Sequence, residues 1–539
     1  MFSALRRPIT VAVVVVLSMV SAAVPAQATP GHQDEGLVVL TPVAQDVGPS
    51  IAKSPGSDHR GEAKREGPLA KGAGGNRPKP GGAADGALQS AATTALGTVP
   101  GLSFDGVGVG LGAYAPCCAP PDTNASVGTT QVVQWVNLDF AVFDKSTGTL
   151  LQGPTPGNSF WTGFTAGNCD KNNDGDPIIK FDAQASRWFA TQFSVTGGPP
   201  YFQCIAISSG ADIISSTWTR YAFSFGSQFP DYPKLGVWPD AYYMSFNRFL
   251  NGVNFSGAAA CAFDRAAMLA GSPTATGQCF NLGTSVASLL PSDLDGATGA
   301  AGSTALPPPG APNVFANFGT NALNLSKFHV DFASSVNSTF TSSSLAVPAF
   351  STACGGGACI AQAGTTNKLD SLADRLMYRL AYRNFGDHEA LVVTHSVNGS
   401  GTAAPRWYEL RSPGTGTFSV YQASSFAPDA TYRWMGSAAM DKIGDLAIGY
   451  SASSGSINPA IRYTGRGPLD PLSQLRIEAT IQPGGGSQTG TLHRWGDYSS
   501  MALDPTDDCT FWYTTEYLKA NGAFNWSTRL FSFRFTGCQ

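Results

Sequence analysis

The sequence is poor in charge and in histidine, and it lacks long apolar runs beyond its first residues. Charged residues make up 13% of the 539 positions and only six residues are histidine, so a metal centre built from several histidines is not expected. The net charge of −4, without a basic stripe, argues against a nucleic-acid partner. No later stretch reaches the roughly 18 apolar residues that a membrane helix needs, so we predict no membrane span.

The first 28 residues have the pattern of an export signal. Arg6 and Arg7 precede an apolar run at 9–20, and the small-residue motif AQA ends at position 28. We therefore predict a secreted, extracellular protein. Residues 29–98 are rich in glycine, proline, alanine and mixed charge and nearly free of aromatics. Such a composition buries too little apolar surface to offset chain entropy, so it predicts a disordered linker or propeptide.

Several catalytic and metal-binding motifs are also missing. The sequence has no P-loop, no dinucleotide fingerprint, no GxSxG motif with matching His and Asp, and no CxxC or Cys/His zinc spacing. Ten cysteines in an exported chain therefore indicate disulfides, although spacing alone does not fix their connectivity. Local pairing would join Cys354–Cys359, Cys261–Cys279, Cys169–Cys204 and Cys509–Cys538, and would leave the adjacent Cys117 and Cys118 as a vicinal bridge.

From residue 99 onward, similar units recur along the chain. Each begins with an acidic or aromatic cluster, continues as a short apolar strand, turns at Asp or Gly and enters another strand. The units begin near positions 122, 176, 231, 293, 374, 433 and 497. Each holds about four strands, and radial repetition of four antiparallel strands gives a β-propeller. Two packed sandwiches would explain the alternating strands but not the recurring opening cluster.

We therefore predict an all-β fold in which residues 99–539 form a β-propeller of seven four-stranded blades. The last unit supplies only three strands before the chain ends at Gln539. A strand from 102–112 is expected to complete that blade and close the ring.

In a propeller, the residues that open each blade converge at one mouth of the central channel. This convergent set is Asp122, Asp176, Asp231, Asp293, Asp374, Arg375, Arg433, Trp434, Arg494, Trp495, Asp497 and Tyr498, with His395 and Glu516 added from the ends of second strands. Acids that follow the first strand of a unit are expected at the opposite face, where Asp side chains satisfy backbone donors in turns.

The convergent residues offer two kinds of chemistry. Arg375, Arg433 and Arg494 carry forked donors that could bind a carboxylate, sulfate or phosphate group, with Trp434, Trp495 and His395 beside them. Alternatively, each arginine pairs with an Asp of a neighbouring blade and joins the ring together. Acids at the same mouth, Asp176, Asp231 and Asp497, could perform acid–base chemistry on a glycosidic bond.

One stretch carries a family resemblance. SSGADIISSTW, at 208–218, is similar to an Asp-box, with Asp212 and Trp218 in the matching positions. Residues 99–539 as a whole resemble secreted bacterial propellers of the sialidase or BNR type. The resemblance implies an arginine triad for a substrate carboxylate at Arg375, Arg433 and Arg494. It further implies a nucleophile pair of Tyr498 with Glu516 and a proton donor at Asp176 or Asp231.

DKNNDGDP, at 170–177, has the alternating oxygens of a calcium loop. Asp170, Asn172, Asp174 and Asp176 would supply ligands to Ca²⁺, and Gly175 the turn. Position twelve is Phe181 rather than the glutamate of an EF-hand, so the loop is not an EF-hand. A plain turn is the alternative. No cofactor is required by the sequence.

The leading hypothesis is a secreted, monomeric glycan-active enzyme, a sialidase-like glycoside hydrolase that binds an acidic sugar of an extracellular glycan or glycoconjugate. One alternative is a non-catalytic carbohydrate-binding or cell-surface interaction propeller. Another is a polysaccharide lyase on uronate-containing glycans, with Tyr498 and His395 as base and acid. An enzyme requires two carboxyls, or a Tyr–Glu pair, in an open pocket beside free arginines, whereas a structural ring would have arginines paired with Asp.

Overall fold

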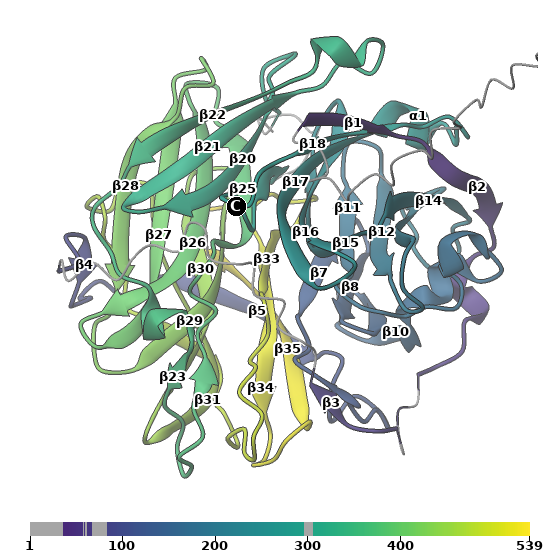
Figure 1. Cartoon of the computed structure of the whole chain (residues 1–539). Helices are drawn as coiled ribbons and strands as arrows, with labels where there is room; N and C mark the ends of the chain where they lie inside the picture. Colours follow the sequence, from purple (N-terminus) through teal and green to yellow (C-terminus); the bar gives the residue numbers. More distant parts are fainter. Residues whose placement is uncertain (1–35, 58, 60–61, 67–83, 296–305) are drawn as a thin grey trace, which may run out of the picture. The chain divides into compact units, whose positions relative to one another are not determined.

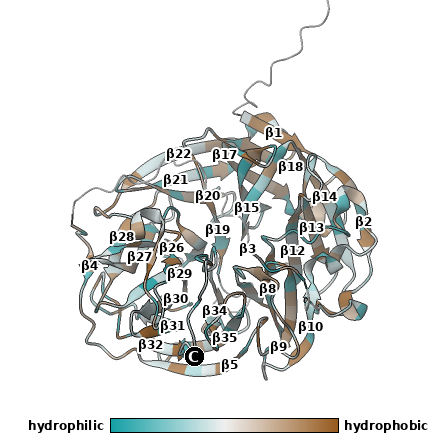
Figure 2. Ribbon diagram, turned by 60° about the horizontal axis from the view of Figure 1, so that its bottom comes forward, coloured by the Kyte–Doolittle hydropathy of each residue, from teal (hydrophilic) through white to brown (hydrophobic). Residues whose placement is uncertain are grey.

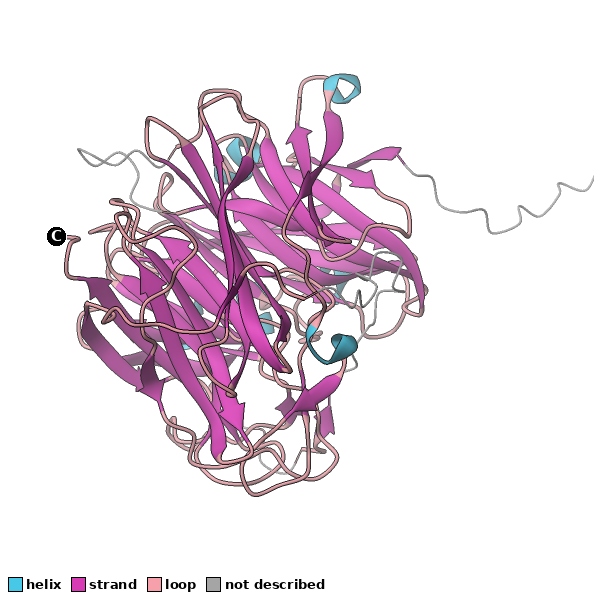
Figure 3. Cartoon of the chain, turned by 90° about the vertical axis from the view of Figure 1, so that its left-hand side faces the viewer, coloured by secondary structure: helices cyan, strands magenta, loops and turns pink. Residues whose placement is uncertain are grey.

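Short apolar segments separated by Gly, Asp and Ser turns form antiparallel strands through most of the chain (Figure 1). The computed structural model describes residues 36–57, 59, 62–66, 84–295 and 306–539. Helix in these ranges is limited to α1 (Arg265–Leu269) and brief 3₁₀ turns (Figure 3). The 3₁₀ turns are Ile51–Lys53, Gly157–Trp161, Ala166–Asn168, Ser335–Asn337 and Ala353–Gly356. The predicted export signal lies outside the described residues.

Four-stranded antiparallel groups follow one another along the sequence, and Figure 2 shows the sheets arranged around a common centre. The first group is β7 (Asn124–Val127), β8 (Gln131–Val136), β9 (Asp139–Asp144) and β10 (Leu150–Pro156). The second is β11 (Ile178–Asp182), β12 (Arg187–Ser194), β13 (Tyr201–Ser208) and β14 (Trp218–Gly226). The third is β15 (Gln228–Val237), β16 (Ala241–Leu250), β17 (Asn254–Asp264) and β18 (Gly277–Asn281).

The next two groups share one continuous nine-stranded sheet. One is β19 (Leu290–Leu294), β20 (Asn313–Gly319), β21 (Ala322–His329) and β22 (Thr339–Ala346). The other is β25 (Met377–Asn384), β26 (Glu389–Gly399), β27 (Thr402–Ser412) and β28 (Ser419–Phe426). They meet through a parallel pairing of β19 with β25. The small sheet of β23 (Ala358–Ile360) and β24 (Leu369–Asp370) lies between them in sequence.

The last groups bring the chain back to its start. One is β29 (Tyr432–Met440), β30 (Leu446–Ser454), β31 (Ile457–Arg466) and β32 (Ala479–Gln482). The other is β33 (Ser500–Leu503), β34 (Phe511–Leu518) and β35 (Trp526–Phe535), completed by β5 (Thr98–Asp105) against β35. The protein is thus an all-β propeller closed by an N-terminal strand, which begins four residues earlier than 102. Because two groups share a sheet, the count of seven blades stays a prediction.

The segment predicted to be a disordered linker instead contributes strands to the outside of the propeller. β1 (Gly36–Leu40) pairs with β18, β2 (Pro42–Gly48) with β14, and β4 (Leu88–Gln89) with β28. β3 (Arg65–Glu66) pairs with β6 (Cys118–Ala119). Composition missed these strands because exposed outer strands need hydrogen-bond partners rather than a large apolar face of their own. The domain boundaries themselves stay predictions.

Aromatic and aliphatic side chains fill the spaces between neighbouring sheets and form the core. The five disulfides that local spacing suggested are all formed. Within the described ranges, no helix has the length and apolar character to cross a membrane.

Candidate active site

A left-handed residue precedes the inner strand of several blades and turns the chain at the channel mouth. Asp122, Asp176, Tyr232, Ser288 and Met435 have φ of 49°, 43°, 55°, 51° and 54°. Regular strand pairing begins or resumes two residues after each of them. Such φ values cost roughly 1–2 kcal/mol in a residue with a Cβ, so the surrounding fold must hold them. The repeated turn brings residues that open different blades to the same end of the channel.

A cavity of about 330 Å³ occupies this end of the channel. Six residues of the predicted convergent set line it: Asp122, Asp176, Asp231, Arg375, Arg494 and Asp497. Sequence reasoning missed an apolar part of the lining, which includes Leu138, Phe193 and Phe229. The rings of Phe193 and Phe229 meet edge to face at 5.1 Å. The prediction that distant blade-opening acids and arginines converge is therefore correct for these six residues.

Two acids of the cavity, Asp176 and Asp231, remain partly exposed. Burial raises the pKa of Asp176 to about 6, although the Lys234 ammonium opposes that rise. Burial and repulsion from Asp176 raise the pKa of Asp231 well above its ordinary value. The two carboxyls thus have raised pKa values in different surroundings, Asp176 near the Lys234 ammonium and Asp231 near Asp176, and such a difference can assign an acid and a base.

Asp122 and Asp497 are more deeply buried, whereas Asp174 is also partly exposed. Asp122 accepts the Asp497 backbone N–H at 2.6 Å and the Asn137 amide at 2.9 Å. Burial, reinforced by repulsion from Asp497, raises the pKa of Asp122 well above its usual range. These two hydrogen bonds tie Asp122 to the turn that leads into the last blade.

Both cavity arginines are engaged with carboxylates. The Arg375 Nε donates to Asp374 at 2.8 Å, and its guanidinium lies 4.6 Å from the Tyr232 ring centre. Arg494 forms an ion pair with Asp497. Among the charged residues that line the cavity, five are acids and two are arginines. The cavity mouth is therefore acidic and its arginines are paired with carboxylates, so it does not have the positive charge that a pocket for a free anion would need.

Three tyrosines and a lysine pack together next to the cavity, which Tyr232 lines. Tyr232, Tyr378 and Tyr498 are buried, and Tyr498 meets each of the other rings at 6.2 Å. The Lys234 ammonium lies 3.4 Å from the Tyr232 ring centre and 4.2 Å from that of Tyr498, and it donates to the Pro233 carbonyl. Burial lowers the pKa of Lys234 to about 8. Lys234 and Tyr232 stand in the DYPK opening of their blade, which was the signal that could have revealed them.

The predicted Tyr498–Glu516 nucleophile pair is not formed. In the described part of the chain, the Tyr498 hydroxyl and the Glu516 Oε1 have no hydrogen-bond partner, and both side chains are buried. Burial raises the pKa of Tyr498, and burial together with repulsion from Asp122 raises that of Glu516. Because the Tyr498 hydroxyl is not hydrogen-bonded to the Glu516 carboxyl, Glu516 does not remove its proton in this arrangement.

Four other predicted binding residues lie away from the cavity. Arg433 is fully buried and paired with Glu478 and Asp429, at 2.7 and 3.0 Å. Trp434 and Trp495 are buried in one core cluster, with ring centres 5.9 Å apart. Trp434 and Trp495 therefore pack between blades and do not offer an exposed ring on which a sugar could stack.

His395 is also a core residue. Its Nε2 lies 3.0 Å from the Tyr408 hydroxyl, and its ring packs against Phe350 at 4.7 Å. Burial lowers the pKa of His395 well below its ordinary value. Because it does not line the cavity, it does not provide the proposed acid or base of a lyase.

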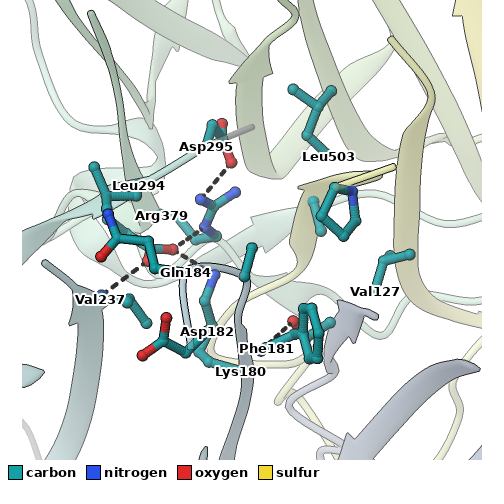
Figure 4. Close-up of a pocket in the computed structure, with 15 residues that line it drawn as sticks. Val127, Lys180, Phe181, Asp182, Gln184, Val237, Leu294, Asp295, Arg379 and Leu503 are labelled. Carbon is teal, nitrogen blue, oxygen red and sulfur yellow. Dashed lines mark hydrogen bonds and ion pairs between the residues drawn. The ribbon is translucent and has the colours of Figure 1, made fainter. Parts of the chain in front are cut away.

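Asp293 lies at the opposite end of the channel, because it stands near the end of the inner strand β19 rather than before its start. It accepts Lys180 and the Arg379 Nε, and Arg379 also pairs with Asp295 at 2.6 Å (Figure 4). The space among these charges is only about 40 Å³. Both ends of the channel carry charged groups, but this end is filled by ion pairs.

The loop at 170–177 does not bring its predicted calcium ligands together. Asp174 accepts the Val195 and Thr196 backbone N–H groups, and the Asn172 amide donates to Ser194. Among the described residues, the one group of three ligand-type side chains within 4.8 Å is His59, Glu62 and Cys117. The Asp174 carboxylate thus holds the neighbouring loop, as in the plain-turn alternative.

The Asp-box-like stretch lies between β13 and β14, the third and fourth strands of its blade. Asp212 accepts the Ile214 and Ser215 backbone N–H groups, each at 2.9 Å, and Trp218 is fully buried. The turn therefore has a structural role and lies outside the cavity.

The fold and the cavity define an all-β propeller with an acid-lined mouth. Comparisons with known proteins show only that its strands are arranged similarly to those of some solved structures. No family model and no curated protein matches the sequence. Among solved structures, the chain is similar to the phage phi92 endosialidase, with 8% identity, a TM-score of 0.34, and 78% of this chain and 67% of that chain covered. An endo-arabinase from Bacteroides thetaiotaomicron VPI-5482 has 15% identity and a TM-score of 0.25 over 53% of this chain and 92% of that one. Drosophila Semaphorin 1b has 6% identity and a TM-score of 0.31 over 84% and 89%.

Proposed function

We propose that the protein is a secreted glycoside hydrolase whose active site is the cavity at the propeller mouth. The observation that carries this proposal is that two partly exposed carboxyls, Asp231 and Asp176, line one cavity and have raised pKa values with different neighbours as contributing causes. Hydrolysis of a glycosidic bond requires such a pair. The apolar lining with Phe193 and Phe229 suits the C–H faces of a sugar ring.

In the proposed reaction, Asp231 donates its proton to the leaving glycosidic oxygen as the bond to the anomeric carbon breaks. Asp176 removes a proton from the attacking water, whose oxygen forms the new bond to that carbon. One water is consumed, and transfer of a proton from Asp176 through solvent restores Asp231. Lys234, beneath the cavity, favours the ionised form of Asp176.

Substitution of each acid tests the proposal. Asp231→Asn and Asp176→Asn are expected to lower kcat/KM on a susceptible glycan by 10²–10⁴-fold, the usual contribution of a general acid or base. Asp240→Asn is the matched control, because Asp240 lies in the turn at the other end of the same inner strand and outside the cavity. Unchanged activity in both cavity variants would exclude this pair as the catalytic groups.

A non-catalytic binding propeller is the second candidate. It is favoured by the pairing of Arg375 with Asp374 and of Arg494 with Asp497. Retention of glycan binding without turnover in the wild-type protein, over pH 4–9, would support it.

A further inference from the structure

Behind Tyr232, which lines the cavity, the channel is filled by packed side chains. Tyr232 packs against Tyr498 and Tyr498 against Tyr378, all three are buried, and the Lys234 ammonium lies against two of the rings. Beyond Tyr378, its neighbour Arg379 is paired with Asp293 and Asp295 at the far end of the channel. A polymer chain therefore has no path through the channel, and a substrate must enter and leave by the same opening.

The size of the cavity limits what enters it. A volume of about 330 Å³ lies at the lower end of the ~300–1,000 Å³ that ligand pockets occupy. Such a space holds one or two sugar rings rather than a long internal stretch of a polysaccharide. A glycan would therefore present its end to Asp176 and Asp231.

The charges of the lining select against an anionic sugar. Five acids face two arginines, and Arg375 and Arg494 already pair with Asp374 and Asp497. A sugar carboxylate or sulfate would have to compete with those carboxylates and would be repelled by the acids that are ionised. An uncharged sugar instead offers hydroxyl donors to carboxylate oxygens and a C–H face to Phe193 and Phe229.

We propose that the cavity accepts the uncharged terminal sugar of a glycan and that the enzyme releases single sugars from the chain end. This proposal rests on the proposed hydrolase function and specifies its substrate. It replaces the acidic sugar that the sequence resemblance implied, because the third arginine of that triad, Arg433, is buried elsewhere.

The test uses the full secreted chain and fluorescently end-labelled oligosaccharides of four to six sugars. The neutral probes are gluco-, xylo-, manno-, galacto- and arabino-oligosaccharides, and the anionic probes are oligouronates and sialylated oligosaccharides. We expect one neutral series to lose sugars one at a time, with loss of activity in Asp231→Asn and retention in Asp240→Asn. Early appearance of internal fragments, or faster cleavage of an anionic probe, would overturn the proposal.

Binding measurements separate failure of this proposal from failure of the hydrolase function. Saturation-transfer NMR would compare neutral monosaccharides with glucuronate and sialic acid on the wild-type protein and on Phe229→Ala. Binding of a neutral sugar that weakens at least about tenfold in Phe229→Ala, without any cleavage, would retain the ligand class and reject the hydrolase. Neither cleavage nor binding of a neutral sugar would reject both.

Discussion

Aspartate has two different roles in this propeller, and the position of the residue along the inner strand determines which role it has. Asp182, after an inner strand, is fully buried and accepts both Arg265 and the Tyr242 hydroxyl. Asp231, before regular pairing resumes, remains partly exposed and has a raised pKa because of burial and repulsion from Asp176. Ion pairing holds the Asp182 carboxylate in a structural role, whereas the raised pKa of Asp231 favours the protonated form that a general acid requires.

Lys234 is expected to set the protonation of the proposed base. Its ammonium lowers the pKa of Asp176 against the effect of burial, so Lys234→Met should move the acid limb of the pH–activity profile upward, on the order of one unit. Lys234→Arg, which retains the charge, should shift it less. The measurement is kcat/KM from pH 4 to 9, with thermal unfolding to confirm that each variant folds. An acid limb that stays near pH 6 in Lys234→Met would contradict this role.

At the scale of the element, closure of the ring depends on one strand that comes from far away in the sequence. β5 pairs with β35, and the Leu102 backbone N–H donates to the Ser532 hydroxyl at 2.9 Å. At Gly101 the strands approach so closely that a Cβ would lie 2.4 Å from the Ser532 Oγ and 3.2 Å from its carbonyl oxygen. The absence of a side chain there permits the closing pairing.

Gly101→Val should therefore weaken closure. Forced overpacking of this kind costs about 1–3 kcal/mol, which calorimetry or chemical denaturation would detect. Gly455→Ala is the control, since a Cβ at Gly455 meets no atom within 4 Å. Equal unfolding free energies for the two variants would show that the β5–β35 approach tolerates a side chain.

At the scale of the whole molecule, residues 36–98 bind the outside of the propeller at several places. Beyond the pairings of β1, β2 and β4, Ile51 is buried in a core cluster. Arg406, fully buried, is paired with Asp85. Removal of this segment would expose apolar core and leave the Arg406 charge without Asp85, which is costly for a buried ion pair.

A chain that begins at residue 97, and so keeps β5, should be less stable than one that begins at residue 35. We expect its melting temperature to fall by at least about 5 °C. Differential scanning calorimetry of the two chains measures the difference, and Arg406→Met in the short chain should recover part of it by removing the unpaired charge. A removable propeptide would instead leave the melting temperature unchanged.

The fold class could be predicted because its cause is local. Short apolar strands, Asp and Gly turns and a recurring opening cluster are all visible in the sequence, and so is the missing strand of the last blade. The same periodicity placed Asp176, Asp231 and Arg494 at one mouth, where they line one cavity. Asp293 was misplaced because its repeat is weak, and a shift of a few residues moves a side chain to the other end of a short strand.

The roles of the side chains could not be predicted, because they depend on neighbours that the sequence does not specify. Trp434 and Arg433 open a blade as predicted, yet both side chains are packed into the protein. The sequence by itself determined an all-β repeat and the convergence of several acids at the mouth, since these follow from residue type and spacing, and local spacing suggested the disulfide pairs without fixing them. Only the tertiary structure decided which carboxyls stay exposed, which arginines are neutralised and that the channel is closed, because burial and pairing arise when blades distant in sequence come into contact.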